Sequence, residues 1–121
     1  MLLDAETFPK TARLTKRSEF LDLFRRGRKV HTSHFILFSK AGRTGESRLG
    51  ITVSAKVGNA VVRNRIKRFL RELFRRQYRK LLSQRDFVIV AKRGAGELAW
   101  PEIHDEIESI FAQREKKRKN G

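Results

Sequence analysis

The sequence predicts an α+β domain with the element order α-β-β-α-β-α, in which helices and strands share one small mixed sheet in a sandwich-like arrangement. A strand with alternating apolar residues precedes a long amphipathic helix at 59–82, and a continuous apolar strand follows that helix at 86–91. The length of 121 residues leaves room for one domain and not for a second independent core. We therefore expect one sheet built around a long basic crossover helix.

The N-terminal third predicts an arm, a helix and a β-rich run. Residues 1–13 contain no sustained period and predict a flexible arm. A short helix is expected over 18–26, because the segment begins with Ser18, a good N-cap, ends in two arginines and is followed by glycine. A β-rich run over 29–40 predicts the first strand region, and the glycine-containing segment 41–47 predicts a turn.

The central third predicts a strand followed by the long helix. Apolar and small or polar residues alternate over 48–54, which indicates a strand with one packed face and one polar, open face. Asn59 is a good N-cap for the helix at 59–82. One side of that helix carries an apolar stripe that begins at Val62, and the other side is basic.

The C-terminal third predicts one strand and one helix. Residues 86–91 have no polar alternation, which is typical of a strand covered on both faces. A loop follows at 92–98, and Pro101 suits the first position of a last helix. We thus expect a single domain at 1–113 and a basic disordered tail at 114–121.

Charge restricts the class of partner. The formal net charge is +16, which favours polyanionic partners because neutralised phosphates release counterions. RNA, DNA and an anionic membrane surface all satisfy this condition. The absence of cysteine excludes disulfides, thiolate metal sites and cysteine nucleophiles. No secretion signal or membrane-length apolar run is present, so we expect a soluble, unexported protein.

The densest positive charge lies at the start of the long helix, in residues 56–72. Free backbone N–H groups at a helix N-terminus favour phosphate, and arginine side chains add bidentate contacts. The alternative is a solvated helix face, but Glu72 is the only carboxylate in this segment, so ion pairing within the helix cannot balance the charge. The segment is therefore a candidate nucleic-acid platform.

Three phenylalanines are candidates for an aromatic surface that binds unpaired bases: Phe20, Phe24 and Phe38. The alternative is that all three are core residues, since phenylalanine is among the residue types most often buried. Periodicity does not choose between the two interpretations.

The sequence contains no recognisable protein catalytic centre and no convincing metal site. His31 and His34 are three residues apart in a predicted strand, so they would point to opposite faces. His104 lies among carboxylates that are typical of a helix surface. No Walker loop, H-E-x-x-H sequence or nucleophile elbow is present. We predict no catalytic and no metal-binding residue in the chain.

Residues 49–72 resemble the signature of the protein component of bacterial ribonuclease P. The similarity is centred on Val57-Gly58-Asn59-Ala60-Val61-Val62-Arg63-Asn64-Arg65-Ile66-Lys67-Arg68 and extends over residues 14–113. It implies an α/β sandwich, similar to a ribosomal protein, with a left-handed β-α-β crossover at the motif helix. It also implies a small protein that assists a catalytic RNA in removing the 5′ leader of precursor tRNA, in the cytoplasm, without a membrane or an obligate protein partner. Mg²⁺, held mainly by the RNA, is the implied cofactor.

The resemblance also implies roles for individual residues. Those expected to contact the catalytic RNA are Lys56, Asn59, Arg63, Asn64, Arg65, Lys67, Arg68 and Arg71. Those expected to bind the 5′ leader, in a cleft between the first helix and the sheet, are Phe20, Phe24, Phe38, Thr52, Ser54 and Lys56. Two rival classes are a ribosomal or ribosome-assembly protein without an enzyme role and a freestanding nuclease that cleaves RNA without an RNA subunit.

Overall fold

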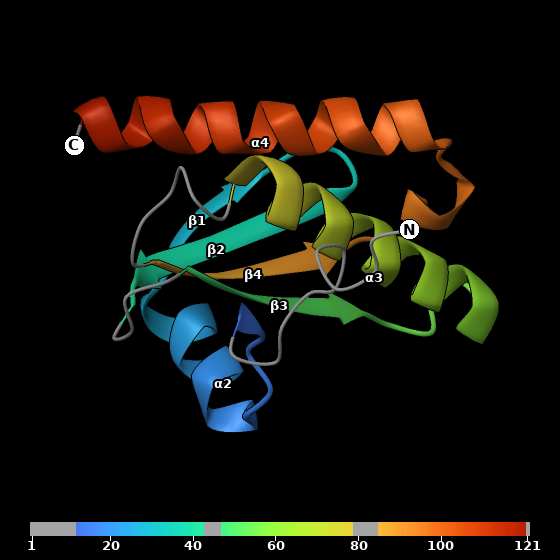
Figure 1. Ribbon diagram of the computed structural model, residues 1–121, viewed down its shortest axis with the longest axis horizontal. Coiled ribbons are helices and arrows are strands. Elements are labelled where there is room, and N and C mark those ends of the chain that lie inside the picture. The colour runs from blue at the N-terminus through green and yellow to red at the C-terminus, as the bar shows by residue number, and fades with distance from the viewer. Residues whose placement is uncertain (1–11, 43–46, 79–84, 121) are drawn as a thin grey trace.

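The computed structural model describes residues 12–42, 47–78 and 85–120, and the side chains of these residues up to 114 (Figure 1). The elements are α2 (Arg17–Arg26), β1 (Arg28–His31), β2 (Phe35–Ala41), β3 (Arg48–Val53), α3 (Ala60–Leu73), a π-helical turn (Phe74–Tyr78), β4 (Arg85–Ala91), a 3-10 turn (Ala95–Glu97) and α4 (Trp100–Asn120). The α+β class predicted from the sequence is confirmed.

Four strands form one mixed sheet in the order β1-β2-β4-β3. The pairs β1–β2 and β2–β4 are antiparallel, and β3 and β4 are parallel neighbours. The chain passes between these two parallel strands through α3. The N-terminus of α3 therefore lies at the carboxyl ends of β3 and β4.

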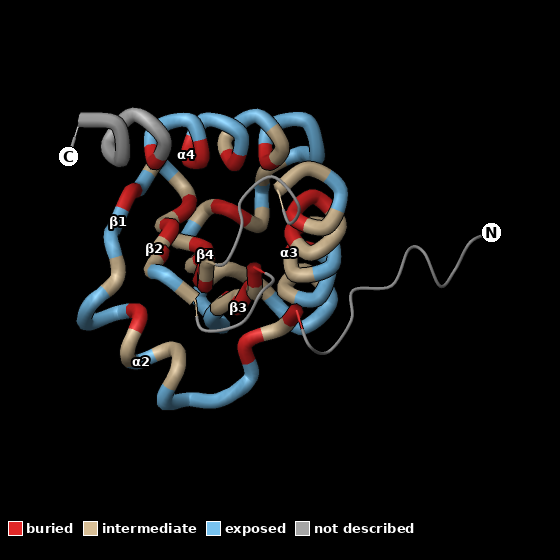
Figure 2. The backbone as a smooth tube through the Cα atoms, turned by 60° about the vertical axis from the view of Figure 1, so that its left-hand side comes forward, coloured by how far each residue is buried: buried red, intermediate tan, exposed pale blue. Residues whose placement is uncertain are grey.

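One face of the sheet is closed by α3 and α4. The core on this face joins Phe35 and Leu37 of β2 and Phe87 and Ile89 of β4 to apolar residues of both helices. Figure 2 shows the buried positions of α3 and α4 turned toward the strands, with exposed positions on the outer side. The apolar residues of both helices recur at helical spacing, so that each helix presents an apolar stripe to the sheet.

The opposite face is covered by α2 and by the segment that precedes it. Leu23 of α2 and Leu14 pack on Val88 of β4, with Phe20 and Phe38 at the margin. Val88 and Ile89 are both buried, one on each face, as expected for a strand without polar alternation. The three layers are thus α2, the sheet, and α3 with α4.

The β-rich run at 29–40 is two strands, so the predicted element order lacks one strand. Thr32 donates its backbone N–H to the carbonyl of Phe35 at 2.9 Å, which closes a turn between β1 and β2. The turn consists of the polar residues Thr32, Ser33 and His34. The correct order is α-β-β-β-α-β-α.

The end of the long basic helix and the C-terminal tail also differ from expectation. The α-helical part ends at Leu73 and continues as a π-helical turn, and residues 79–84 lie outside the described residues. The backbone of residues 114–120, predicted to be disordered, continues α4 as a helix. Most of the predicted arm also lies outside the described residues. Its last two residues are described, and there Ala12 is fully buried and Arg13 forms a β-bridge to Leu49.

Candidate nucleic-acid interface

The start of α3 is fixed by its own polar residues. The side-chain oxygen of Asn59 accepts the backbone N–H of Val62 at 3.0 Å, which is the N-cap predicted from the sequence. The Nε of Arg63 donates to the carbonyl of Gly58 at 3.1 Å. Two of the residues expected to bind RNA therefore hold the helix start in place, and Arg63 is half-buried in doing so.

The outer side of α3 exposes a basic face. Ile66, Leu70 and Leu73 are buried against the sheet. The exposed residues on the other side include Val61, Asn64, Arg65 and Arg68. We call these four residues the outer α3 face.

Arg65 connects this face to the start of α4. Its Nη2 donates to the carbonyl of Gly96 at 3.4 Å, and its guanidinium carbon lies 5.9 Å from the centroid of the Trp100 ring. The Trp100 ring packs on Phe69, with 4.2 Å between ring centroids. The arginine is thereby oriented while it stays exposed to solvent.

Two further basic residues of α3 are half-buried. Lys67 lines a groove on the α2 side of the molecule. Burial lowers the pKa of Arg71 below its usual value, and the positive charge of Arg13 lowers it further. These neighbouring cations create a region of positive potential that favours a phosphate group.

An open groove of about 470 Å³ runs between α2, β3 and α3. The residues that line it are Arg17, Phe20, Leu21, Phe24, Ile51, Thr52, Val53 and Lys67. We call it the aromatic groove. The Phe24 ring lies 6.5 Å from the Phe20 ring and meets the Phe38 ring edge-on at 5.0 Å, measured between centroids. Phe24 is 39% exposed, so the three phenylalanines form a partly open surface and not a closed core.

Gly50 makes room for this aromatic surface. A Cβ atom at this position would lie 2.6 Å from Cζ of Phe20, which is closer than real side chains approach. Gly50 belongs to the polar face of β3 that the sequence predicts to be open. The face is instead partly covered by α2, and the missing side chain lets Phe20 settle against the strand.

The structure brings together only some of the residues expected in the cleft. Ser54 and Lys56 are exposed beyond the end of β3 and do not line the aromatic groove. Phe38 does not line it either, and it reaches the groove only through its contact with the Phe24 ring. Conversely, Arg17 and Leu21 line it and were missed. A helical signal exists for both, since positions 17, 21 and 24 stand one turn apart on the same side of α2 as Phe20.

Ion pairs fix α2 against the sheet. Arg48 of β3 pairs with Asp86 of β4 and with Glu19 of α2, each at 2.9 Å. The hydrogen bond to Asp86 is the main reason that the pKa of Arg48 is raised above its usual value. Lys40 and Arg26 both pair with Asp22. These ion pairs lie on the opposite side of α2 from the aromatic groove, and they hold α2 in the position that shapes the groove.

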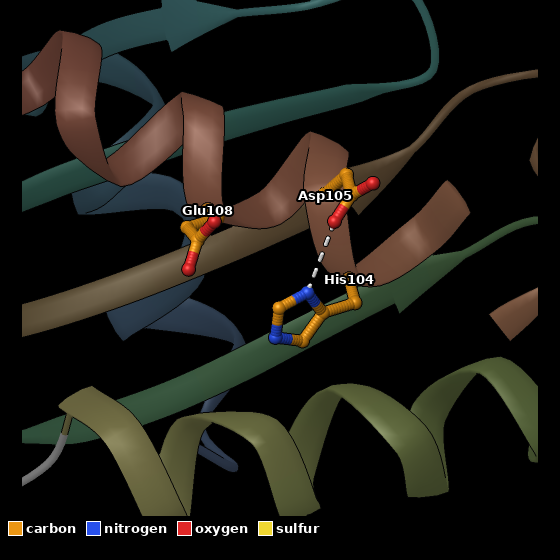
Figure 3. A group of neighbouring side chains, drawn as sticks. All are labelled: His104, Asp105 and Glu108. Carbon is orange, nitrogen blue, oxygen red and sulfur yellow. Dashed lines mark hydrogen bonds and ion pairs between the residues drawn. The ribbon is translucent and has the colours of Figure 1, made fainter. Parts of the chain in front are cut away.

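Histidine and carboxylate side chains are the candidate ligands for a metal ion in this chain. In the described part of the chain, the one trio with ligand atoms within 4.8 Å of one another is His104, Asp105 and Glu108 (Figure 3). The Nδ1 atom of His104 lies 3.2 Å from Asp105, and its Nε2 atom lies 3.3 Å from Gln77. Both ring nitrogens are thus within hydrogen-bond distance of neighbouring side chains, and both carboxylates are exposed, an arrangement that is common among acidic groups that hold no ion.

Comparisons with known proteins identify the family of the chain. The family model described as Ribonuclease P matches residues 8–115. A ribonuclease P protein component from Geobacter sp. (strain M21) is 45% identical, covering 95% of this chain and 98% of that relative. One from Bacillus pumilus (strain SAFR-032) is 36% identical, covering 84% of this chain and 87% of that relative.

Solved structures show the same fold. The Staphylococcus aureus RNase P protein superposes with a TM-score of 0.80 at 29% identity, covering 87% of this chain and 96% of that chain. The Thermotoga maritima RNase P protein has a TM-score of 0.72 at 29% identity, covering 81% and 93%. A mutant of the S. aureus protein is described as having defective mRNA degradation activity.

Within the described residues, no helix combines the length and the apolar character that crossing a bilayer requires. The family match covers the basic helix, the sheet and both flanking helices, and the relatives are matched over most of their own length. The chain therefore belongs to the ribonuclease P protein family, the protein component of a tRNA-processing endoribonuclease that contains the ribonuclease P RNA.

Proposed function

We propose that this chain binds the catalytic RNA of ribonuclease P through the outer α3 face and holds the 5′ leader of precursor tRNA in the aromatic groove. The observation that best supports the proposal is the groove itself. Half-exposed aromatic rings form one wall, and Arg17 and Lys67 stand at its margin. A single strand of RNA requires this combination of stacking surface and positive charge.

The arrangement explains how the protein would favour precursor over product. Bases of an unpaired leader would stack on Phe24 and pack beside Phe20, while Arg17 and Lys67 would neutralise its phosphates. Mature tRNA has no leader and gains none of these contacts. The preference for precursor would then come from binding energy that the product cannot recover.

The outer α3 face is suited to a second, separate contact. Arg65 and Arg68 are exposed on a helix side that bears no carboxylate among its described residues. Guanidinium groups bind phosphates with two parallel hydrogen bonds. Placed against the catalytic RNA, this face would reduce phosphate repulsion between that RNA and the substrate.

The hydrolysis itself is assigned to the RNA subunit. Mg²⁺ held by RNA phosphates would activate water and stabilise the leaving oxygen. The residues of this chain then act as binders: they hold the leader, orient the substrate and supply positive potential.

A precursor-tRNA cleavage assay at low Mg²⁺ tests the proposal. The three arms are protein alone, catalytic RNA alone, and both together, with an mRNA fragment as a second substrate for the protein-alone arm. Cleavage at the mature 5′ end only in the mixture is the expected result. Cleavage of either substrate by protein alone would favour the freestanding nuclease, and an unchanged RNA rate on adding protein would contradict the proposed role.

A further inference from the structure

A second basic cavity lies at the opposite end of the sheet from the start of α3. It has a volume of about 200 Å³, and the residues that line it are Arg26, Arg28, Ser39, Lys40, Arg85 and Arg114. We call it the basic pocket. Five of these six residues are cationic, and none is a carboxylate. Neither the expected leader-binding set nor the expected RNA-binding set includes any of them.

The sheet register assembles the basic pocket from distant parts of the chain. Arg28 of β1 stands opposite Ser39 of β2, and Arg85 of β4 stands opposite Ala41, next to Lys40. Arg114 reaches the same cavity from α4, whose C-terminal part lies at the left-hand end of the sheet in Figure 1. Long-range folding therefore concentrates positive charge that is spread over residues 26–114 in the sequence.

Arg114 is the least exposed of these cations. Arg114 is 2% exposed, and its guanidinium carbon lies 5.4 Å from the centroid of the Phe87 ring. Ser39 is also 2% exposed, and it adds a hydroxyl to the same cavity.

Among the described residues, two carboxylates near the basic pocket are already engaged by cations. Asp22 is shared between Arg26 and Lys40, so one negative charge serves two cations. Asp86, at the amino end of β4, is bound through both of its oxygens to Arg48 at 2.9 and 3.0 Å. The five lining cations and the one carboxylate of Asp22 together leave a strongly positive local charge.

We propose that the basic pocket is a phosphate-binding site. Arginine side chains and a hydroxyl group are the donors that a tetrahedral oxyanion accepts from, and the charge of the cavity selects an anion. The site is distinct from the start of α3, because β4 separates the two ends of the sheet by seven residues, or about 20 Å. The phosphate is either a group of an RNA backbone or free inorganic phosphate.

Phosphate binding to the full chain tests the site without any RNA. Inorganic phosphate is titrated at constant ionic strength against chloride, and binding is followed by the rise in melting temperature. The test variant is the double substitution Arg28→Ala with Arg85→Ala. This choice leaves the buried Arg114 in place, so that a folding defect does not obscure the result.

Two control variants remove the same charge elsewhere. Arg25→Ala with Arg93→Ala alters exposed arginines outside the basic pocket, and Arg65→Ala with Arg68→Ala alters the outer α3 face. The test variant should bind phosphate about tenfold more weakly than the unmodified chain, and the first control should differ by less than about twofold. Unchanged phosphate affinity in the test variant, or an equal loss in the first control, would overturn the proposal.

A second arm distinguishes the two sources of phosphate, and it rests on the proposed binding of the catalytic RNA. If an RNA phosphate occupies the pocket, the test variant should also lower the salt dependence of RNA binding by about one to two counterions. If the occupant is free phosphate, only the phosphate titration changes. Failure of the unmodified chain to bind RNA would count against the proposed function, whereas the phosphate titration would still test the pocket.

Discussion

The two faces of the sheet use similar apolar side chains to different ends. On the face covered by α3 and α4, Phe87 is fully buried and meets Phe74 and Phe111 at centroid distances of 5.7 and 5.5 Å. On the face covered by α2, Phe24 contacts Phe38 at 5.0 Å but is 39% exposed. Two long helices close the first face, and one short helix leaves the second partly open.

Exposure, and not residue type, therefore distinguishes the aromatic side chains that stabilise this fold from those that are left to bind a partner. Aromatic rings packed on all sides stabilise the domain through burial. Rings with one free side keep that surface for a partner. Substitutions on the closed face should therefore change the free energy of unfolding, and substitutions on the open face should chiefly change RNA affinity.

The largest expected effect is on the closed face. Phe87→Ala should reduce the free energy of unfolding by about 3–5 kcal/mol, because it leaves a cavity among packed aromatic rings. Urea unfolding followed by circular dichroism measures this loss. A loss smaller than that of Phe24→Ala would contradict the division of the two faces.

The next largest loss of stability is expected at the contact between α2 and β3. Gly50→Ala should cost about 1–3 kcal/mol, because the new Cβ would collide with the Phe20 ring. In a Phe20→Ala background the same change should cost much less, since the ring is absent. A double-mutant cycle of urea unfolding measures the coupling, and additive losses would show that Phe20 does not rest on Gly50.

A polar link between β1, β2 and α4 supplies a third effect. The carboxylate of Glu106 accepts the Thr32 hydroxyl at 2.5 Å and the His34 backbone N–H at 2.6 Å, and its other oxygen lies 2.9 Å from His34 Nδ1. Burial alone would raise the pKa of Glu106, but the hydrogen bonds from Thr32 and His34 outweigh burial and hold the pKa below 4.5.

The lowered pKa fixes the sign of the pH dependence. The folded state binds this proton less readily than the unfolded state, so the stabilisation is complete above the usual pKa of 4.5 and is lost as pH falls through the lower folded value. Glu106→Gln should cost about 1–2 kcal/mol at neutral pH and should show a weaker loss of stability on acidification. Melting temperatures from pH 7 to pH 3 check this, and parallel curves for both proteins would exclude the role of Glu106.

The smallest effect on stability is expected on the open face. Phe24→Ala should change the free energy of unfolding by less than about 1.5 kcal/mol, since its ring is only partly covered. Its unfolding curve is compared with that of Leu23→Ala, the neighbouring residue that is 1% exposed. Equal losses in the two variants would show that Phe24 belongs to the core.

Much of the fold was predictable because local patterns matched tertiary packing. The continuous apolar run of β4, the alternation of β3 and the stripe of α3 each predicted the correct element. The turn at Thr32-Ser33-His34 was missed because its residues also occur in strands, and no glycine or proline marks it. The last apolar anchor of α4 is Phe111. The helix at 114–120 continues on helical propensity alone, so no apolar pattern in the sequence indicated it.

The site was predictable in part for a different reason. Charge density indicated the basic helix, aromatic character made the phenylalanines candidates, and the resemblance placed them in a cleft. The structure brings Phe20, Phe24 and Thr52 to one groove. The resemblance did not indicate that Asn59 and Arg63 are used to begin the helix, because a capping residue and a phosphate ligand look alike in a sequence. The basic pocket could not be predicted, since its residues meet only through strand register and the return of α4.

The most direct test of leader binding in the aromatic groove is a ratio of two affinities, that of the reconstituted ribonucleoprotein for precursor tRNA and that for mature tRNA. We expect Phe24→Ala to lower this ratio by about tenfold through weaker precursor binding, and Arg65→Ala with Arg68→Ala to weaken protein–RNA assembly without changing the ratio once assembly is complete. An unchanged ratio in Phe24→Ala, or equal losses for precursor and mature tRNA, would contradict the assignment of the leader to the aromatic groove.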